Sequence, residues 1–416
     1  MYKAVFLVGC LVVFNETTLY AQNSALRTPL ELITQITNHQ LQELVLKEGT
    51  YPKGNWDIVK TSTLPTAMYW SYPTGVSLLG MQRVYDITKN DEIMRFVKKN
   101  NNISADQYAY LRWQKKAFGT VYNTDGFEKL WRLDMLDDCG AMGAAILESA
   151  LEHKVNFTPA LQELVDIAGN YVTNVQYRLE DGTFYRPFSP EGPTIWADDL
   201  YMSLPFLIRW SQYKKDAAAL TDAAIQIINF ASYLQDADGI WLHAYFVDKK
   251  ARSCCKWGRA NGWVAVAIAE VLSVLPPSHP QRNAVFAIYK KHLDGLVKHQ
   301  SPSGLWNQVV DHPELTWGTE TSCSAQFTYA IARGINKGWL DKSYIPVVQK
   351  AFAGLEKQVT SNGSINKVCM STSIGNDLEY YNTRSFKDDD YHGNGLMLLA
   401  LTEIYRLFEK EKIAFK

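Results

Sequence analysis

Asp238-Gly239-Ile240-Trp241 and Ser303-Gly304-Leu305-Trp306 are two copies of one short pattern, in which a glycine and one further residue precede an aromatic or aliphatic residue. Weaker copies of the pattern start at four other glycines: Gly54, Gly119, Gly182 and Gly363. The six glycines follow one another at intervals of 57 to 65 residues. An interval of about 60 residues accommodates two helices and their loops. The spacing therefore predicts six helical hairpins.

The segments between these glycines have the apolar periodicity of helices, and strand-like alternation is scarce. We expect helices over residues 28–47, 76–100, 138–152, 158–178, 198–213, 216–235, 260–275, 281–299, 321–336, 342–359 and 393–410. The helix after each loop is apolar nearly all round, as in 262–272, and the next helix has one polar face, as in 281–299. Such helices form an inner and an outer ring. The sequence thus predicts an all-α fold, an (α/α)6 barrel or six-hairpin toroid, in one catalytic domain over residues 22–416.

The first 21 residues have the pattern of an export signal. Lys3 precedes an apolar run, Ala4 to Phe14, which is too short to span a bilayer. Ala21 is a small residue at a suitable cleavage point. We therefore expect a signal peptide over residues 1–21, no membrane span, and a periplasmic or secreted protein. The alternative is a lipoprotein anchor at Cys10, which the continuation of the apolar run beyond that cysteine disfavours.

Composition excludes several classes of function. The chain has 42 Lys and Arg against 43 Asp and Glu, so no basic excess is present to neutralise a nucleic acid. The 12 Trp, 23 Tyr and 17 Phe suit the flat faces of sugar rings, although a large aromatic core would require the same composition. Five cysteines follow the signal peptide without regular spacing, and no zinc-binding pattern is present. We expect neither a disulfide framework nor a metal or cofactor.

Paired acids open two of the expected inner helices. Asp137-Asp138 precede a segment of small residues, and Asp198-Asp199 follow Trp196. One aspartate at a helix start is explained by capping. Two in each of two adjacent hairpins would place carboxylates across one cavity, as acid/base chemistry on a glycoside needs. A neighbouring carboxylate and an aromatic wall would raise one pKa and keep that group protonated.

A third cluster is the dense motif Trp257-Gly258-Arg259-Ala260-Asn261-Gly262-Trp263. The planar guanidinium of Arg259 can bind a carboxylate through two hydrogen bonds, or it can pair with one of the aspartates. His243 lies shortly before this motif and is either a site residue or structural. Three further helix starts carry polar or aromatic residues: Tyr72 in the first, Ser322 and Ser324 in the fifth, and Asp390 to Gly395 in the last, which we expect to be structural.

Together these motifs resemble the unsaturated rhamnogalacturonyl hydrolases of glycoside hydrolase family 105, which are related to the unsaturated glucuronyl hydrolases of family 88. The resemblance implies an enzyme that removes a terminal Δ4,5-unsaturated uronic acid from oligosaccharides released by lyases from rhamnogalacturonan or a related acidic polysaccharide. It implies that an aspartate protonates C4, that water adds at C5, and that the hemiketal opens. The acid/base falls on Asp198 or, in the alternative register, on Asp199, and the second aspartate on Asp138. The implied substrate contacts are His243, Trp257, Arg259, Trp263, Trp196, Tyr72, Ser322 and Ser324.

Two features depart from the family pattern: the doubled acids, and a loop from Lys249 to Lys256 that contains Cys254-Cys255. The sugar after the uronate remains open between rhamnose, glucose, an amino sugar and a sulfated residue. Two other functions also remain open. One is an ordinary glycosidase, lyase or epimerase on the same toroid, and the other is a glycan-binding protein without catalysis.

Overall fold

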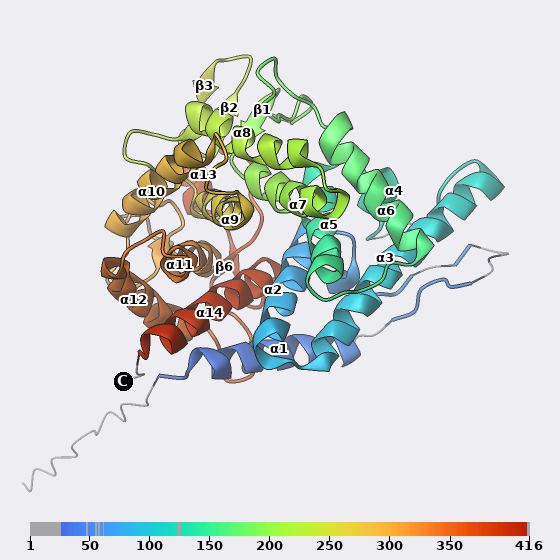
Figure 1. The fold of residues 1–416 in the computed structure, drawn as a ribbon, viewed down its shortest axis with the longest axis horizontal. Helices are drawn as coiled ribbons and strands as arrows, with labels where there is room; N and C mark the ends of the chain where they lie inside the picture. Colours follow the sequence, from blue (N-terminus) through green and yellow to red (C-terminus); the bar gives the residue numbers. More distant parts are fainter. Residues whose placement is uncertain are drawn as a thin grey trace, which may run out of the picture.

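Twelve long helices alternate between two concentric rings in the described part of the chain (Figure 1). The computed structural model describes residues 26–46, 49–54, 56, 59–60, 62–122 and 126–413, so the expected signal peptide and Cys10 lie outside it. The inner ring consists of α2 (Tyr72–Thr88), α5 (Leu136–Leu151), α7 (Asp199–Lys214), α9 (Gly258–Val274), α11 (Thr321–Asn336) and α14 (Tyr391–Glu411). The outer ring consists of α1 (Pro29–Leu46), α3 (Asp91–Phe118), α6 (Pro159–Asn170), α8 (Ala217–Leu234), α10 (Arg282–Lys298) and α12 (Ile345–Glu356).

The toroid closes between the two ends of the chain, because α1 packs against α14 and α14 packs against α2. The predicted (α/α)6 architecture is confirmed. None of the described helices is long and apolar enough to cross a bilayer.

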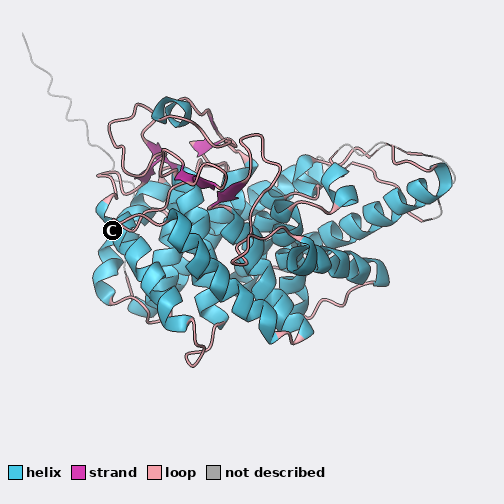
Figure 2. Ribbon diagram, turned by 90° about the horizontal axis from the view of Figure 1, so that it is seen from above, coloured by secondary structure: helices cyan, strands magenta, loops and turns pink. Residues whose placement is uncertain are grey.

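Short elements lie between the long helices, most of them in the loops that lead to the inner helices, and Figure 2 shows the strands gathered at one end of the molecule. The strands are β1 (Thr194–Trp196), β2 (Ala244–Phe246), β3 (Ala251–Arg252), β4 (Trp306–Asn307), β5 (Thr319–Glu320), β6 (Val368–Cys369) and β7 (Phe386–Lys387). They pair antiparallel in the orders β1-β2-β3, β4-β5 and β6-β7. The short helices are α4 (Glu128–Arg132), α13 (Leu378–Asn382), the 3-10 turns η1 (Thr66–Met68) and η3 (Lys342–Tyr344), and the π turn η2 (Tyr171–Val175).

The helix expected over 76–100 is in fact two antiparallel helices, so that prediction is wrong. Lys89 ends α2 in the left-handed conformation, with φ of 53°. The side chain of Asn90 accepts a hydrogen bond from the backbone N–H of Glu92 and so caps α3. The apolar pattern runs through this turn because both helices bury a face there, and periodicity alone does not reveal the reversal.

The repeated glycine pattern marks the same turn at four of its six positions. Gly182, Gly239, Gly304 and Gly363 have φ between 84° and 92°, where a side chain is strained. A Cβ on Gly239 would also lie 2.2 Å from the carbonyl oxygen of Lys291, so the turn packs tightly on the outer helix α10. The second copy is not such a turn, since Gly119 instead ends the long helix α3.

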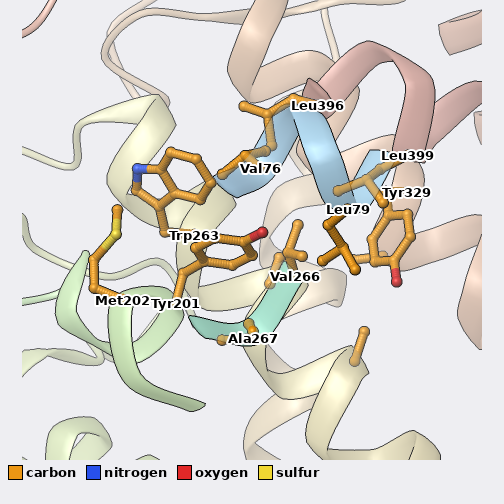
Figure 3. Packing of buried hydrophobic residues seen from close by; sticks show 14 of the residues in the cluster. Val76, Leu79, Tyr201, Met202, Trp263, Val266, Ala267, Tyr329, Leu396 and Leu399 are labelled. Atoms are coloured by element: carbon orange, nitrogen blue, oxygen red, sulfur yellow. The ribbon is translucent and has the colours of Figure 1, made fainter. Parts of the chain in front are cut away.

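The centre of the toroid is filled by side chains from the inner helices (Figure 3). The rings of Tyr201 and Trp263 lie 4.5 Å apart between their centroids, and both are almost fully buried. Val76 and Leu396 pack beside them from α2 and α14. Because this core is closed, a substrate pocket on the toroid axis is confined to one mouth, where the inner helices begin.

A ring of alternating charges lies near the opposite ends of the inner helices. Each inner helix contributes one member, in the order Arg83, Glu148, Arg209, Glu270, Arg333 and Glu403. The oxygen–nitrogen distances between neighbours run from 2.6 Å for Arg83–Glu148 and Glu148–Arg209 to 3.4 Å for Glu270–Arg333. Asp86 and Arg406 connect the last member back to the first. The ring therefore joins all six inner helices at the floor of the toroid, away from the mouth.

Candidate active site

Neither acid pair at the mouth acts as a helix cap. The N-cap positions of α5 and α7 are Met135 and Asp198, and neither side chain makes a capping hydrogen bond. The carboxylates point instead to residues from other loops. Capping therefore does not explain why these helices begin with acids.

Asp138 is buried between α2 and the short helix α4. Its Oδ1 accepts a hydrogen bond from the backbone N–H of Tyr72 at 2.8 Å, and Lys129 Nζ lies 3.0 Å from its Oδ2. Burial and the neighbouring charge of Asp137 raise the pKa of Asp138 to about 6, although Lys129 opposes the shift. Near neutral pH this carboxyl group can therefore hold or release a proton.

Arg186 joins the two acid pairs, and the sequence analysis did not identify it. Its Nε donates to both carboxylate oxygens of Asp199 at 3.1 Å, and its Nη2 donates to Asp137 at 2.9 Å. Asp199 is completely buried and has both oxygens occupied by this guanidinium. The sequence signal for Arg186 was its position two residues after Phe184, which belongs to the repeated glycine turn.

Asp198, in contrast, has a carboxylate oxygen with no hydrogen-bond partner among the described residues, namely Oδ2. This atom lies 3.4 Å from Nε2 of His243, and the residue is 8% exposed. The indole of Trp196 stands edge-on to the imidazole of His243 at 5.3 Å between centroids. Of the two adjacent acids, Asp198 is thus the one that is free to act on a bound molecule.

His243 is held by Tyr381, a second residue that the sequence analysis did not identify. The Tyr381 hydroxyl lies 2.7 Å from Nδ1 of His243 and accepts a hydrogen bond from the backbone N–H of Gly375 at 3.0 Å. With Tyr381 donating to Nδ1, the neutral imidazole carries its proton on Nε2, the nitrogen that faces Asp198. His243 thus lies beside Asp198, and its role as a site residue stays a prediction.

Arg259 supplies a buried positive charge beside these residues. Its guanidinium lies 4.9 Å from the ring centre of Trp257, which itself lies 4.8 Å from the His243 ring. The guanidinium donates to the backbone carbonyls of Cys369 and Met370, the latter at 2.7 Å. Within the described residues it forms no ion pair with an aspartate, so the pairing that the sequence left open is absent. The charge remains available to an anionic ligand.

Tyr72 and His392 are joined by a hydrogen bond at the start of the first and last inner helices. The Tyr72 hydroxyl lies 2.7 Å from Nε2 of His392, and Asp390 holds the other ring nitrogen. Burial and the charge of Arg259 lower the pKa of His392, which favours the neutral ring. The segment from Asp390 to Gly395 was expected to be only structural, but His392 belongs to the same hydrogen-bonded cluster as Tyr72.

Ser322 and Ser324 are buried, and their hydroxyl groups are occupied by protein atoms. Ser322 donates to the carboxylate of Glu320 at 2.8 Å, and Ser324 donates to the backbone carbonyl of Glu320 at 2.6 Å. The Glu320 carboxylate also accepts three backbone hydrogen bonds, two of which cap α11 while the third comes from Cys369. Trp263 lies beneath the site against Tyr201. The roles of these two serines and of Trp263 as substrate contacts stay predictions, and the serine contacts indicate a structural role.

An aromatic cleft adjoins the acids on the side of β1. Its lining includes Tyr171, Tyr177, Tyr185, Phe188, Trp196 and the acids Asp134 and Asp137. Phe188 is 84% exposed, and the guanidinium of Arg186 lies 4.6 Å from the ring of Trp196. Exposed aromatic faces next to the acids are typical of a sugar-binding surface. Of the aromatic residues in this cleft, the sequence predicted a site role only for Trp196.

Comparison with known proteins agrees with this arrangement. The profile of Glycosyl Hydrolase Family 88 matches residues 51–408. The unsaturated rhamnogalacturonyl hydrolase YesR of Bacillus subtilis (strain 168) is 26% identical over 361 residues, which are 84% of this chain and 94% of YesR. An unsaturated 3S-rhamnoglycuronyl hydrolase of Alteromonas sp. (strain LOR) is 29% identical over 214 residues, half of each chain.

A solved structure has the same fold. The family 105 glycoside hydrolase of C. acetobutylicum ATCC 824 superposes with a TM-score of 0.73 at 22% identity, covering 91% of this chain and 99% of that one. The match to the family profile spans nearly all of the described helices, and it includes both acid pairs, His243 and Arg259. The chain therefore belongs to glycosyl hydrolase family 88 and is a glycoside hydrolase.

Proposed function

We propose that this enzyme removes a terminal Δ4,5-unsaturated uronic acid from an oligosaccharide by hydrating the C4=C5 double bond. Asp198 gives its proton to C4, and water attacks C5 as its own proton passes to the same carboxylate. The net reaction is addition of one water molecule. The resulting hemiketal at C5 opens, and the sugar attached at C1 then leaves as an alcohol.

The observation that carries this proposal is the unpartnered Oδ2 of Asp198 beside Nε2 of His243. A general acid must reach the substrate with a free oxygen, and Asp199 has both of its oxygens bound by Arg186. His243 can hold the attacking water or the substrate next to that oxygen. Asp199 then has a positioning role, since it fixes Arg186 between the two acid pairs.

Arg259 is the candidate partner of the uronate carboxylate. A buried guanidinium without an ion pair among the described residues favours an anion over neutral sugars. Trp257 stacks on this guanidinium, and the charge of Arg259 acts on the nearby Tyr72 hydroxyl, where it opposes the burial that raises the pKa of Tyr72. The unsaturated ring would therefore lie between Arg259 and Asp198, with its carboxylate towards the former and C4 towards the latter.

The leaving sugar would occupy the aromatic cleft. The residues that line this cleft favour an uncharged sugar. Asp134 and Asp137 line the cleft, and the only cation in its lining, Arg186, is already shared by Asp137 and Asp199. A sulfate or a second uronate would thus meet carboxylates without a free positive partner. The name of the relative YesR is consistent with rhamnose in this position, and we propose a neutral rhamnose-type residue.

The assay that tests the reaction follows the ultraviolet absorbance of the conjugated uronate in an unsaturated disaccharide. We expect the absorbance to disappear with turnover and, in D2O, one deuterium to appear at C4 of the released uronic acid product. Equal cleavage of saturated glycosides, or release of the sugar with the double bond retained, would contradict hydration. Tight binding with no turnover would instead favour a glycan-binding protein.

We also propose that residues 1–21 direct export and that the enzyme works in the periplasm or outside the cell. The support is the basic start, the short apolar run and the small residue at Ala21. N-terminal sequencing of the protein from its natural host should find Gln22 first. A lipid-modified cysteine at Cys10, or an intact Met1, would contradict cleavage at Ala21.

A further inference from the structure

Two adjacent cysteines lie in the loop that connects β3 to α9. Cys254 is exposed and Cys255 is 1% exposed, and their sulfur atoms are 2.7 Å apart. A disulfide bond of about 2.05 Å needs only a small further approach of the two sulfurs. The other cysteines in the described residues, Cys139, Cys323 and Cys369, are all buried.

The cysteine pair is connected to His243 in two ways, directly through the backbone of His243 and indirectly through Gly375 and Tyr381. The backbone N–H of His243 donates to the carbonyl of Cys255 at 3.0 Å. The sulfur of Cys254 lies 3.6 Å from the carbonyl oxygen of Gly375, whose N–H donates to the Tyr381 hydroxyl. Tyr381 in turn binds Nδ1 of His243. A change in the geometry of the pair is therefore transmitted to His243 through its backbone and through its ring.

We propose that Cys254 and Cys255 form a redox-active dithiol, which disulfide oxidants convert to a vicinal disulfide. Formation of this disulfide displaces His243. The thiol chemistry is independent of the proposed function, whereas the effect on turnover rests on it. An exported enzyme meets such oxidants, because disulfides form and persist outside the cytoplasm.

The two sulfurs have different parts in the exchange. The exposed Cys254 thiolate attacks an external disulfide, RSSR, forms a mixed disulfide and releases one thiol, RSH. Cys255 then attacks the Cys254 sulfur, which forms the vicinal bond and expels the second RSH. Two protein thiols are oxidised and one disulfide is reduced, so the electrons balance. Burial and the neighbouring sulfur raise the pKa of Cys255, which lowers its thiolate fraction and makes its attack the slower step.

The test uses the reduced full-length protein, glutathione disulfide as the oxidant, and alkylation of the remaining thiols before digestion. Trypsin cleaves after Arg252 and Lys256, so both cysteines lie in the single peptide Ser253–Lys256. We expect this peptide to escape alkylation and to lose about 2 Da, the mass of two hydrogen atoms, with full reversal by dithiothreitol. Alkylation of both cysteines, or a persistent glutathione adduct on the wild-type peptide, would overturn the proposal.

Cys254→Ser is the matched control, because it removes the exposed thiol and leaves the groups that contact substrate in place. Oxidised wild type should turn over the unsaturated disaccharide about tenfold more slowly, since small displacements of a catalytic group have effects of this size. Cys254→Ser should turn over the disaccharide at the rate of the dithiol form of the wild type, with or without oxidant. Equal rates for oxidised and reduced wild type, or an equal response of the variant, would overturn the link to His243. If the reduced protein lacks turnover, the proposed function fails, but the mass result still decides the thiol chemistry.

Discussion

Oδ2 of Asp198 lies 3.4 Å from Nε2 of His243, whereas the adjacent Asp199 has both oxygens bound by Arg186. Two neighbouring residues of the same type thus have different surroundings: Oδ2 of Asp198 has no hydrogen-bond partner among the described residues, and Asp199 is engaged in an ion pair. The resemblance to the family left this register open, and the contacts favour Asp198.

Asp198→Asn should lower kcat by about 10²- to 10⁴-fold, because the amide cannot exchange a proton with C4 and water. Binding of the unsaturated disaccharide should persist, and it can be measured by calorimetry with the inactive variant. Asp199→Asn is the control for register and should lose less activity but more stability, since Arg186 would keep only Asp137. An inactive Asp199→Asn beside an active Asp198→Asn would assign the chemistry to Asp199.

Tyr381→Phe tests how His243 is positioned. The change removes the hydroxyl that binds Nδ1 of His243 and the N–H of Gly375. We expect kcat to fall by about 10- to 100-fold, because the imidazole loses its fixed tautomer and orientation. Tyr380→Phe is a control on the neighbouring residue, whose ring packs beside Tyr381. Equal effects of the two substitutions would show that the loss is structural and not specific to His243.

Phe188→Ala tests the aromatic cleft. Phe188 is 84% exposed, so its loss should leave stability nearly unchanged while one face of the cleft disappears. We expect KM for an unsaturated disaccharide with a neutral leaving sugar to rise about 2- to 10-fold with kcat retained. Phe118→Ala, at an exposed position on the far end of α3, should have no effect on KM. An unchanged KM in Phe188→Ala would exclude the cleft as the leaving-sugar site.

Lys129→Met tests the electrostatics of Asp138. The pKa of Asp138 is raised, so the folded protein holds this proton more tightly than the unfolded chain, and stability falls as pH rises from about 4 through 6. Loss of Lys129 raises this pKa further. The free energy of unfolding of the variant should therefore match that of wild type near pH 4 and fall increasingly below it towards pH 7. Exposed Lys116→Met should follow wild type at every pH, and a constant offset in Lys129→Met would contradict the coupling.

The residues that the sequence proposed for the candidate site are those with local sequence signals. Acid pairs at helix starts and the Trp257–Trp263 motif are visible in a few residues, and the glycine spacing gave the six hairpins. Tyr381 binds His243 from 138 positions away, and Arg186 binds Asp137 from 49 positions away. The repeated glycine turn marks the loop that carries Arg186, but no local pattern identifies the partners of Arg186 or Tyr381, because these contacts join loops that are far apart in the sequence.

The charge ring is the opposite case, since its pattern is periodic. Each inner helix carries one member of the ring, and hydrogen-bonded neighbours such as Glu148 and Arg209, or Arg209 and Glu270, are 61 positions apart. This interval matches that of the glycine turns. Charges that recur at the hairpin period within the apolar helices were therefore an available sequence signal for the ring.

Glu270→Gln should lower the free energy of unfolding by about 3–5 kcal/mol, because the guanidinium groups of Arg209 and Arg333 would lose a buried partner. Burial opposes ionisation of Glu270, but Arg333, Arg209 and Arg83 outweigh it and hold its pKa below the usual range. The stabilisation from Glu270 is thus fully present above the unfolded pKa of about 4.3 and is lost as pH falls through the lower folded value. Urea unfolding of wild type and variant should therefore converge only in strong acid. Glu92→Gln, which breaks an exposed pair with Arg95 on α3, should cost at most about 1 kcal/mol. A similar small loss for Glu270→Gln would mean that packing, and not the ring of charges, holds the inner helices together at the floor of the toroid.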